Sequence, residues 1–181
     1  IIQVIADGKK LSTVSKNLLR SDADYIIMAE ARDGVALELA MRMAAKGTRR
    51  MKMTFHTGDP MDFPYDAAWE ILKVTEGSVE AIAKKIAGSF DYIFHFIQLK
   101  DKNQKKLGGI YEMSFDRSSD MISIQRICFY NHELDTWSWN YHIGKDKVEK
   151  GIEESRTDFT NFSEALQSLA TSFPTEGMKN A

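Results

Sequence analysis

The clearest structural signal in the chain is the stretch Tyr25-Ile26-Ile27-Met28-Ala29-Glu30-Ala31-Arg32, in which an apolar run ends on charged residues. The run is continuous rather than alternating, which is typical of a strand in a parallel sheet that is covered on both faces. Residues 34–46, rich in Ala, Leu and Met, predict a helix directly after it. Residues 51–55 predict the next strand, so we expect a strand–helix–strand unit here.

Strands and helices are also expected to alternate on both sides of this unit. Upstream, residues 1–5 predict a short strand and residues 11–20 a helix. Downstream, two further helices are expected at residues 65–75 and 78–88. Alternation of this kind predicts right-handed βαβ units, so region 1–89 is expected to form part of a parallel sheet.

Beyond this region the pattern changes to strands alone. Short polar turns join these strands and favour antiparallel hairpins, so we expect an antiparallel region at residues 90–143. In its last strand, Trp137, Trp139 and Tyr141 alternate with polar residues and predict one apolar face. The tail at residues 144–181 is expected to be helical, first charged and then amphipathic. The expected strands are residues 90–100, 109–115, 121–131 and 134–143, and the expected helix is residues 145–173.

Composition narrows the possible functions. With 24 Lys and Arg against 26 Asp and Glu, the chain is close to neutral, which argues against a dedicated nucleic-acid surface but not against a local basic patch. The single cysteine, Cys128, excludes an intrachain disulfide and fits a reducing compartment. No apolar run approaches the roughly 20 residues that a bilayer-spanning helix needs. The histidines lack ligand spacing, so no metal site is expected within this chain.

Two polar side chains follow the two strands of the central unit. Glu30 ends the first strand, and His56 follows the second in the segment Thr54-Phe55-His56-Thr57. Because ligands of open parallel sheets bind beyond the carboxyl ends of the strands, Glu30 and His56 are expected at the same edge. There a carboxylate can orient and deprotonate water, and an imidazole can contact a phosphate. The alternative is that Glu30 caps a helix and His56 is an ordinary loop histidine.

The order of these motifs resembles a known family. Leu19-Arg20, Asp24, Glu30-Ala31-Arg32-Asp33 and then, after a helix, Thr54-Phe55-His56-Thr57 follow one another at the spacing of one family's motifs. The set is similar to the Walker B segment and histidine box of the type II/type IV secretion and pilus traffic ATPases. The resemblance covers roughly residues 9–130.

This resemblance implies roles for individual residues. Glu30 would be the Walker B catalytic glutamate and His56 the histidine-box residue. Arg32 would support the site or an adjacent subunit, and Arg20 would match the arginine before the Walker B strand. Thr54, in the histidine-box strand, would support the nucleotide.

The resemblance also implies a fold and an activity for the whole protein. The fold would be α/β, a partial RecA-like parallel sheet that continues into antiparallel hairpins and ends in C-terminal helices. The function would be that of a cytoplasmic motor ATPase subunit, using ATP with magnesium to drive protein export, pilus assembly or conjugative transfer. It would work as a hexameric ring, attached to the inner membrane through the secretion or pilus machinery.

The sequence departs from the family pattern at three places. Ala29 stands where the family usually has Gly before the glutamate, and Gly47-Thr48 stands where the histidine box usually opens with Gly-His. No G-x-x-x-x-G-K-[ST] phosphate-binding loop occurs in the sequence, and Gly8-Lys9 does not fit one. We therefore expect this chain to be the C-terminal part of a larger ATPase and to be inactive alone.

A basic cluster before the second strand leaves its role open. It is either a solvated loop or an interface that reaches a neighbouring subunit's phosphate. Two other functions also stay open: a non-catalytic assembly module of the same fold, and a nucleic-acid-binding domain that uses this cluster and the aromatic strand. The basic cluster consists of Arg42, Lys46, Arg49, Arg50 and Lys52.

Overall fold

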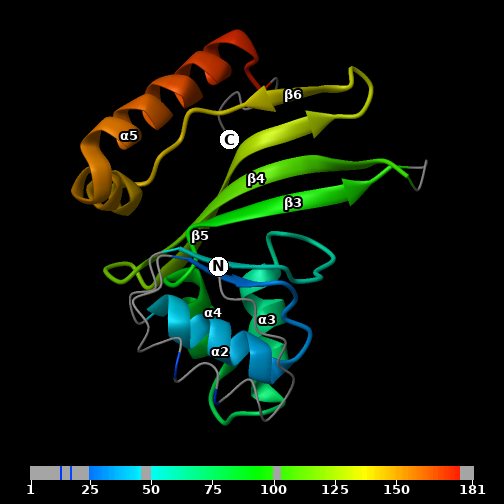
Figure 1. The fold of residues 1–181 in the computed structure, drawn as a ribbon, viewed down its shortest axis with the longest axis vertical. Helices are drawn as coiled ribbons and strands as arrows, with labels where there is room; N and C mark the ends of the chain where they lie inside the picture. The colour runs from blue at the N-terminus through cyan, green and yellow to red at the C-terminus, as the bar shows by residue number, and fades with distance from the viewer. Residues whose placement is uncertain (1–12, 14–16, 18–24, 46–49, 100–102, 176–181) are drawn as a thin grey trace. The chain divides into compact units, whose positions relative to one another are not determined.

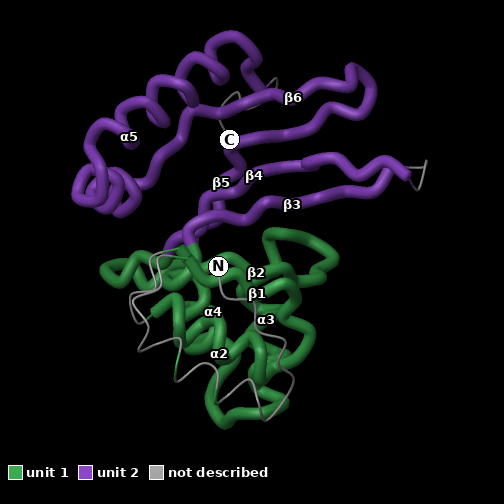
Figure 2. Tube along the Cα trace, in the orientation of Figure 1, with its two compact units in different colours: residues 1–90, 115–122 green, residues 91–114, 123–181 purple. Residues whose placement is uncertain are grey.

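The chain divides into two compact units, which are described here separately. Figure 1 shows a computed structural model that describes residues 13, 17, 25–45, 50–99 and 103–175. Unit 1 consists of residues 1–90 and 115–122, and unit 2 of residues 91–114 and 123–181 (Figure 2). The expected strand at residues 1–5 lies outside the described residues, as does most of the expected helix at residues 11–20.

Unit 1 contains the predicted strand–helix–strand element. Strand β1 (Ile26–Met28) pairs in parallel with β2 (Met51–Met53), and helix α2 (Gly34–Ala45) lies between them in the chain. The register places Met28 opposite Met53. The backbone ladder continues past the strands, because the Ala31 amide donates to the Thr54 carbonyl at 2.9 Å. The βαβ prediction for this region is confirmed.

Two further helices of unit 1 lie at nearly the predicted positions. Helix α3 (Phe63–Leu72) begins with a proline in its first turn, where a missing amide costs no hydrogen bond. Helix α4 (Val79–Ala87) is capped by Ser78, whose hydroxyl accepts the Ala81 amide at 3.1 Å. The three helices pack on one another and bury the core side chains of the unit. Among the most buried are Leu37, Met43, Ile71 and Ile86.

The prediction that β1 is covered on both faces is wrong. Ile26 is buried against Leu39 and Met43 of α2, but Ile27, one residue later, is 72% exposed. Successive side chains of a strand point to opposite faces, and only the Ile26 face meets α2. The continuous apolar run of β1 therefore does not indicate that both faces of the strand are buried. Among the described residues, β2 is the one strand that pairs with β1.

Unit 2 contains most of the predicted antiparallel region and the helical tail, whereas the turn between β4 and β5, with the strand ends beside it, belongs to unit 1. Its sheet has the order β3-β4-β5-β6, with helix α5 running beside β6 (Figure 1). The hairpin prediction is confirmed, and β4 is longer than predicted. The strands are β3 (Tyr92–Gln98), β4 (Lys105–Asp116), β5 (Met121–Asn131) and β6 (Thr136–Trp139), and the helix is α5 (Lys145–Ser172).

The last strand is shorter than predicted, and the segment after α5 pairs with its end. The Trp139 amide donates to the Phe173 carbonyl at 2.8 Å, and the Thr175 amide donates to the Trp139 carbonyl at 3.3 Å. The chain after α5 thus occupies the hydrogen-bonding groups of Trp139. Tyr141 lies beyond the strand and is 52% exposed, so the predicted apolar stripe does not extend to it.

A buried carboxylate marks the start of α5. Glu112 of β4 is 3% exposed, and its Oε1 accepts the Gly144 amide at 2.8 Å and lies 3.4 Å from His142 Nε2. Its Oε2 is buried and has no hydrogen-bond partner among the described residues. Burial raises the pKa of Glu112, while the Gly144 amide, His142 and Lys147 act in the opposite direction.

Substitution of Gly34 tests the close contact between α2 and α3. A Cβ at this position would overlap the Glu70 carbonyl oxygen and lie 2.9 Å from Val74 Cγ2. We expect Gly34→Ala to lower the free energy of unfolding by about 1–3 kcal/mol, because overpacking forces backbone shifts. Gly58→Ala is the control, since no atom lies within 4 Å of a Cβ there. Urea unfolding measures both; equal stability of the two variants would contradict the close approach of α2 and α3.

A second prediction concerns Glu112 and how the free energy of unfolding depends on pH. Its raised pKa means that the folded state holds the proton longer, so the Glu112 contribution to the free energy of unfolding falls as pH rises from about 4 through the folded pKa. Glu112→Gln should remove this contribution while its amide oxygen still accepts the Gly144 amide. Urea unfolding is followed by the fluorescence of Trp137 and Trp139 in a Trp69→Phe background. An unchanged pH profile in Glu112→Gln would contradict the prediction.

Candidate functional site

The predicted site residues Glu30 and His56 meet at the carboxyl ends of β1 and β2. Glu30 Oε1 lies 3.5 Å from His56 Nε2. The parallel register and the Ala31–Thr54 backbone hydrogen bond bring the two loops together. The predicted juxtaposition of Glu30 and His56 is confirmed.

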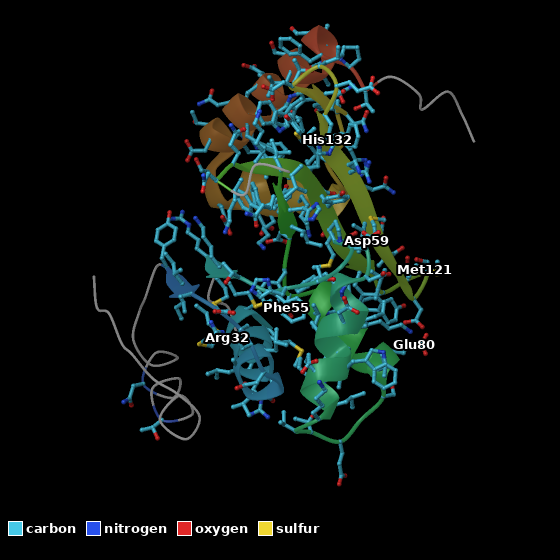
Figure 3. All side chains as sticks on the ribbon, turned by 90° about the vertical axis from the view of Figure 1, so that its right-hand side faces the viewer. Arg32, Phe55, Asp59, Glu80, Met121 and His132 are labelled. Carbon is cyan, nitrogen blue, oxygen red and sulfur yellow. The ribbon has the colours of Figure 1, made fainter. Side chains whose placement is uncertain are left out.

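Arg32 also contacts the Glu30 carboxylate. Its Nε lies 2.6 Å from Glu30 Oε1, the same oxygen that faces His56. In Figure 3, Arg32 lies on the loop after β1 and Phe55 on the segment after β2. The hydrogen bond from Arg32 is the main cause that lowers the pKa of Glu30, and the charge of His56 acts in the same direction, against desolvation. Glu30 is therefore an ionised carboxylate at neutral pH.

Glu30 does not cap the helix that follows it. The Ala36 amide, in the first turn of α2, donates to Asp33 Oδ1 at 2.9 Å. This capping role of Asp33 removes the alternative in which Glu30 serves the helix N-terminus. The carboxylate of Glu30 is 29% exposed and the imidazole of His56 is 92% exposed, so both groups can reach a ligand.

Thr54 has a backbone role in this site. Its hydroxyl donates to the Ala29 carbonyl, next to Glu30 in the chain. The Thr54 backbone adds two ladder bonds, one to Ala31 and one to Met28. Thr54 therefore joins the end of β2 to the end of β1, and this joint holds the two loops of the site together.

A hollow of about 480 Å³ lies beside His56, on the side of α3. Thr57, which follows His56, places its hydroxyl oxygen 2.5 Å from Asp66 Oδ2 and 2.9 Å from the Asp59 carbonyl oxygen. Sequence reasoning missed Asp66; an acidic residue in the first turn of α3 is a weak signal, because it is common at helix N-termini. The hollow is lined by Phe55, His56, Thr57, Gly58, Asp66, Trp69 and Glu70.

The basic cluster is only partly described. Arg20, Lys46 and Arg49 lie outside the described residues, as does Gly47-Thr48. The remaining members are engaged within unit 1. Arg42 pairs with Glu38 on its own helix, Arg50 Nη1 donates to the Tyr25 hydroxyl at 2.9 Å, and the Arg50 and Lys52 cations lie 4.9 Å and 5.7 Å from the centre of the Tyr25 ring.

Two further observations concern metal-binding groups and membrane-spanning helices. Within the described ranges, no group of three or more His, Cys, Asp or Glu side chains is arranged to hold a metal ion. Among the same residues, no helix combines the length and the apolar character that a membrane crossing needs.

Arg32 provides a test of the electrostatics of the site. Arg32→Gln should raise the pKa of Glu30, because the hydrogen bond from the guanidinium is the largest cause that lowers it. His56→Asn should raise it less. Carboxyl ¹³C chemical shifts followed against pH measure the change. Lys73→Gln, which removes the partner of Glu70, is the control and should leave Glu30 unchanged. A Glu30 pKa unaffected by Arg32→Gln would contradict the pairing.

Comparison with protein-family models and with curated proteins finds no match to this chain.

Proposed function

We propose that this chain carries the hydrolytic residues of an ATP-driven motor of the secretion and pilus type, within a RecA-like fold. One observation carries the proposal: Glu30 Oε1 and His56 Nε2 lie 3.5 Å apart at the carboxyl ends of two adjacent parallel strands. Ligands of open parallel sheets bind at this edge. The sequence resemblance to Walker B and the histidine box gives the two residues complementary roles in phosphoryl transfer.

In this proposal Glu30 handles the attacking water. Its carboxylate is ionised and partly exposed, so it can accept a hydrogen bond from water and then its proton. His56 presents an exposed imidazole toward the same space and can donate a hydrogen bond to a phosphate oxygen. Arg32 keeps Glu30 charged and adds a cation near the developing negative charge.

The residues at the site fit the hydrolytic half of an ATP site. A lone carboxylate suits a magnesium-bound water, whereas no described cluster would hold the ion without nucleotide. Magnesium, when bound with ATP, neutralises charge on the phosphates. The sequence has no phosphate-binding loop, so in the proposed motor that loop would belong to polypeptide outside this sequence.

The proposed motor works as a hexameric ring at the cytoplasmic face of the inner membrane. It would couple hydrolysis to protein export, pilus assembly or conjugative transfer through the secretion or pilus machinery. In such a ring, Arg49 and Arg50 would lie near a subunit boundary, and Arg50 would first have to leave the Tyr25 side chain that it contacts. There they can reach a neighbour's phosphate.

A second candidate function is a non-catalytic assembly module of the same fold. The observation that favours it is the 2.6 Å contact between Arg32 and Glu30, which already engages the carboxylate. Arg32 is 78% exposed, however, and an exposed ion pair in water exchanges partners readily. A nucleic-acid-binding domain gains no support from Arg50 and Lys52, which lie over the Tyr25 ring.

Glu30→Gln tests the proposed function in the complete protein that contains this sequence. ATP turnover should fall by about 10²–10⁴-fold, because a general base typically contributes that much. Nucleotide affinity should be unchanged, since the amide has nearly the same shape. Glu38→Gln is the matched control: this carboxylate also pairs with an arginine, yet it belongs to α2 and contacts neither Glu30 nor His56 in the described ion pairs.

His56→Ala should reduce turnover less than Glu30→Gln does. The 181-residue chain alone should not turn over ATP, because it lacks the amides and lysine that hold the phosphates. Wild-type turnover in Glu30→Gln would contradict the proposed function. Steady turnover by the chain alone, lost in Glu30→Gln, would contradict the assignment of the phosphate loop to other polypeptide.

A further inference from the structure

We propose that Asp66 is a positioning residue that holds His56 beside Glu30 through the hydroxyl of Thr57. The geometry of this contact stands by itself, and its importance for turnover rests on the proposed function. Asp66 touches neither Glu30 nor His56 in the described hydrogen bonds and ion pairs; it acts through the residue that follows His56 in the chain.

The position of His56 is determined by its backbone. The imidazole is 92% exposed, and Glu30 is the one described side chain with which it pairs. An exposed side chain with so few contacts has no packing to fix it. Its distance from Glu30 therefore depends on how firmly the segment from Thr54 to Thr57 is held.

Two threonines anchor this segment on opposite sides of His56. Thr54 binds the Ala29 carbonyl and so attaches the segment to β1. The Thr57 hydroxyl oxygen lies 2.5 Å from Asp66 Oδ2 and so attaches the segment to α3. Between the anchors, Phe55 packs edge-on against Phe63 at 5.6 Å between ring centres.

Helix α3 is a firm support for the second anchor. Ala67, Ala68 and Ile71 are at most 1% exposed, and the Asp66 amide donates to the Asp62 carbonyl at 2.9 Å. The Asp66 carboxylate thus projects from a well-packed first turn. We infer that α3 sets the position of His56 relative to Glu30, and that this contact completes the site.

A simpler role for Asp66 is to complement the positive end of the α3 dipole. The two roles differ in their response to substitution. Asp66→Asn loses the charge but keeps an oxygen that can accept the Thr57 hydroxyl, whereas Asp66→Ala loses both. The dipole role predicts that the two variants behave alike. The positioning role predicts that Asp66→Asn, like Thr57→Ser, keeps His56 in place.

The test is a double-mutant experiment on the 181-residue chain without nucleotide. Imidazole ¹⁵N and ¹H shifts of His56, assigned with His56→Asn, are recorded with and without Glu30→Gln. In the wild type, Glu30→Gln should move the His56 resonances, because the two side chains are in contact. In Thr57→Val or Asp66→Ala, more than half of that effect should be lost, and in Thr57→Ser or Asp66→Asn it should remain. Circular dichroism and urea midpoints check that each variant is folded.

The outcomes separate this proposal from the proposed function. An undiminished Glu30→Gln effect in both Thr57→Val and Asp66→Ala would overturn the positioning role. An absent effect in the wild type would overturn the Glu30–His56 contact, and the positioning role with it. In the complete protein, Thr57→Val should lower kcat for ATP with KM unchanged. If the resonance data hold while ATP turnover is absent, the positioning role stands and the motor function fails.

Discussion

The parallel register of β1 and β2 is the constraint on which the site depends. Met28 pairs with Met53, and the ladder runs on to the Ala31–Thr54 hydrogen bond, so the loops that follow both strands leave the same edge. Glu30 and His56 meet because each follows its strand by only a few residues. A slip of one residue would turn the side chains of one strand to the other face and separate the two groups. The burial of Ile26 against α2 opposes such a slip.

The sequence predicted those parts of the fold and site that depend on local pattern. The apolar run at β1, the Ala-rich stretch of α2 and the second run at β2 identified a βαβ unit, and that unit implied the meeting of Glu30 and His56. The one-sided burial of β1 was not predictable, because an apolar run does not reveal which neighbours cover it. Ile27 is as apolar as Ile26, and only the structure shows that α2 reaches one of them.

Hydrogen bonds between residues on different elements could not be predicted from the sequence either. Thr57 and Asp66 are nine residues apart, and their contact depends on the direction in which the chain enters α3. Glu112 and Gly144 are 32 residues apart, and nothing in either local sequence indicates that a strand carboxylate accepts the amide of a helix's N-cap residue. In both cases a hydrogen bond joins two elements whose relative placement comes from packing. A local sequence pattern does not show how two elements pack against each other.

The two units use charge in different ways, and solvent exposure explains the difference. In unit 1, Arg32 is in water and shares Glu30 Oε1 with His56, so the carboxylate can change partners without leaving a buried charge unpaired. In unit 2, Lys147 is 9% exposed and lies 2.8 Å from both Asp91 and Asp146. Lys147 has little access to water, so separating it from its carboxylate partners leaves a poorly solvated charge, which is unfavourable. Exchangeable pairs suit the water and phosphate chemistry proposed for unit 1, whereas the poorly solvated Lys147 suits a fixed start for α5.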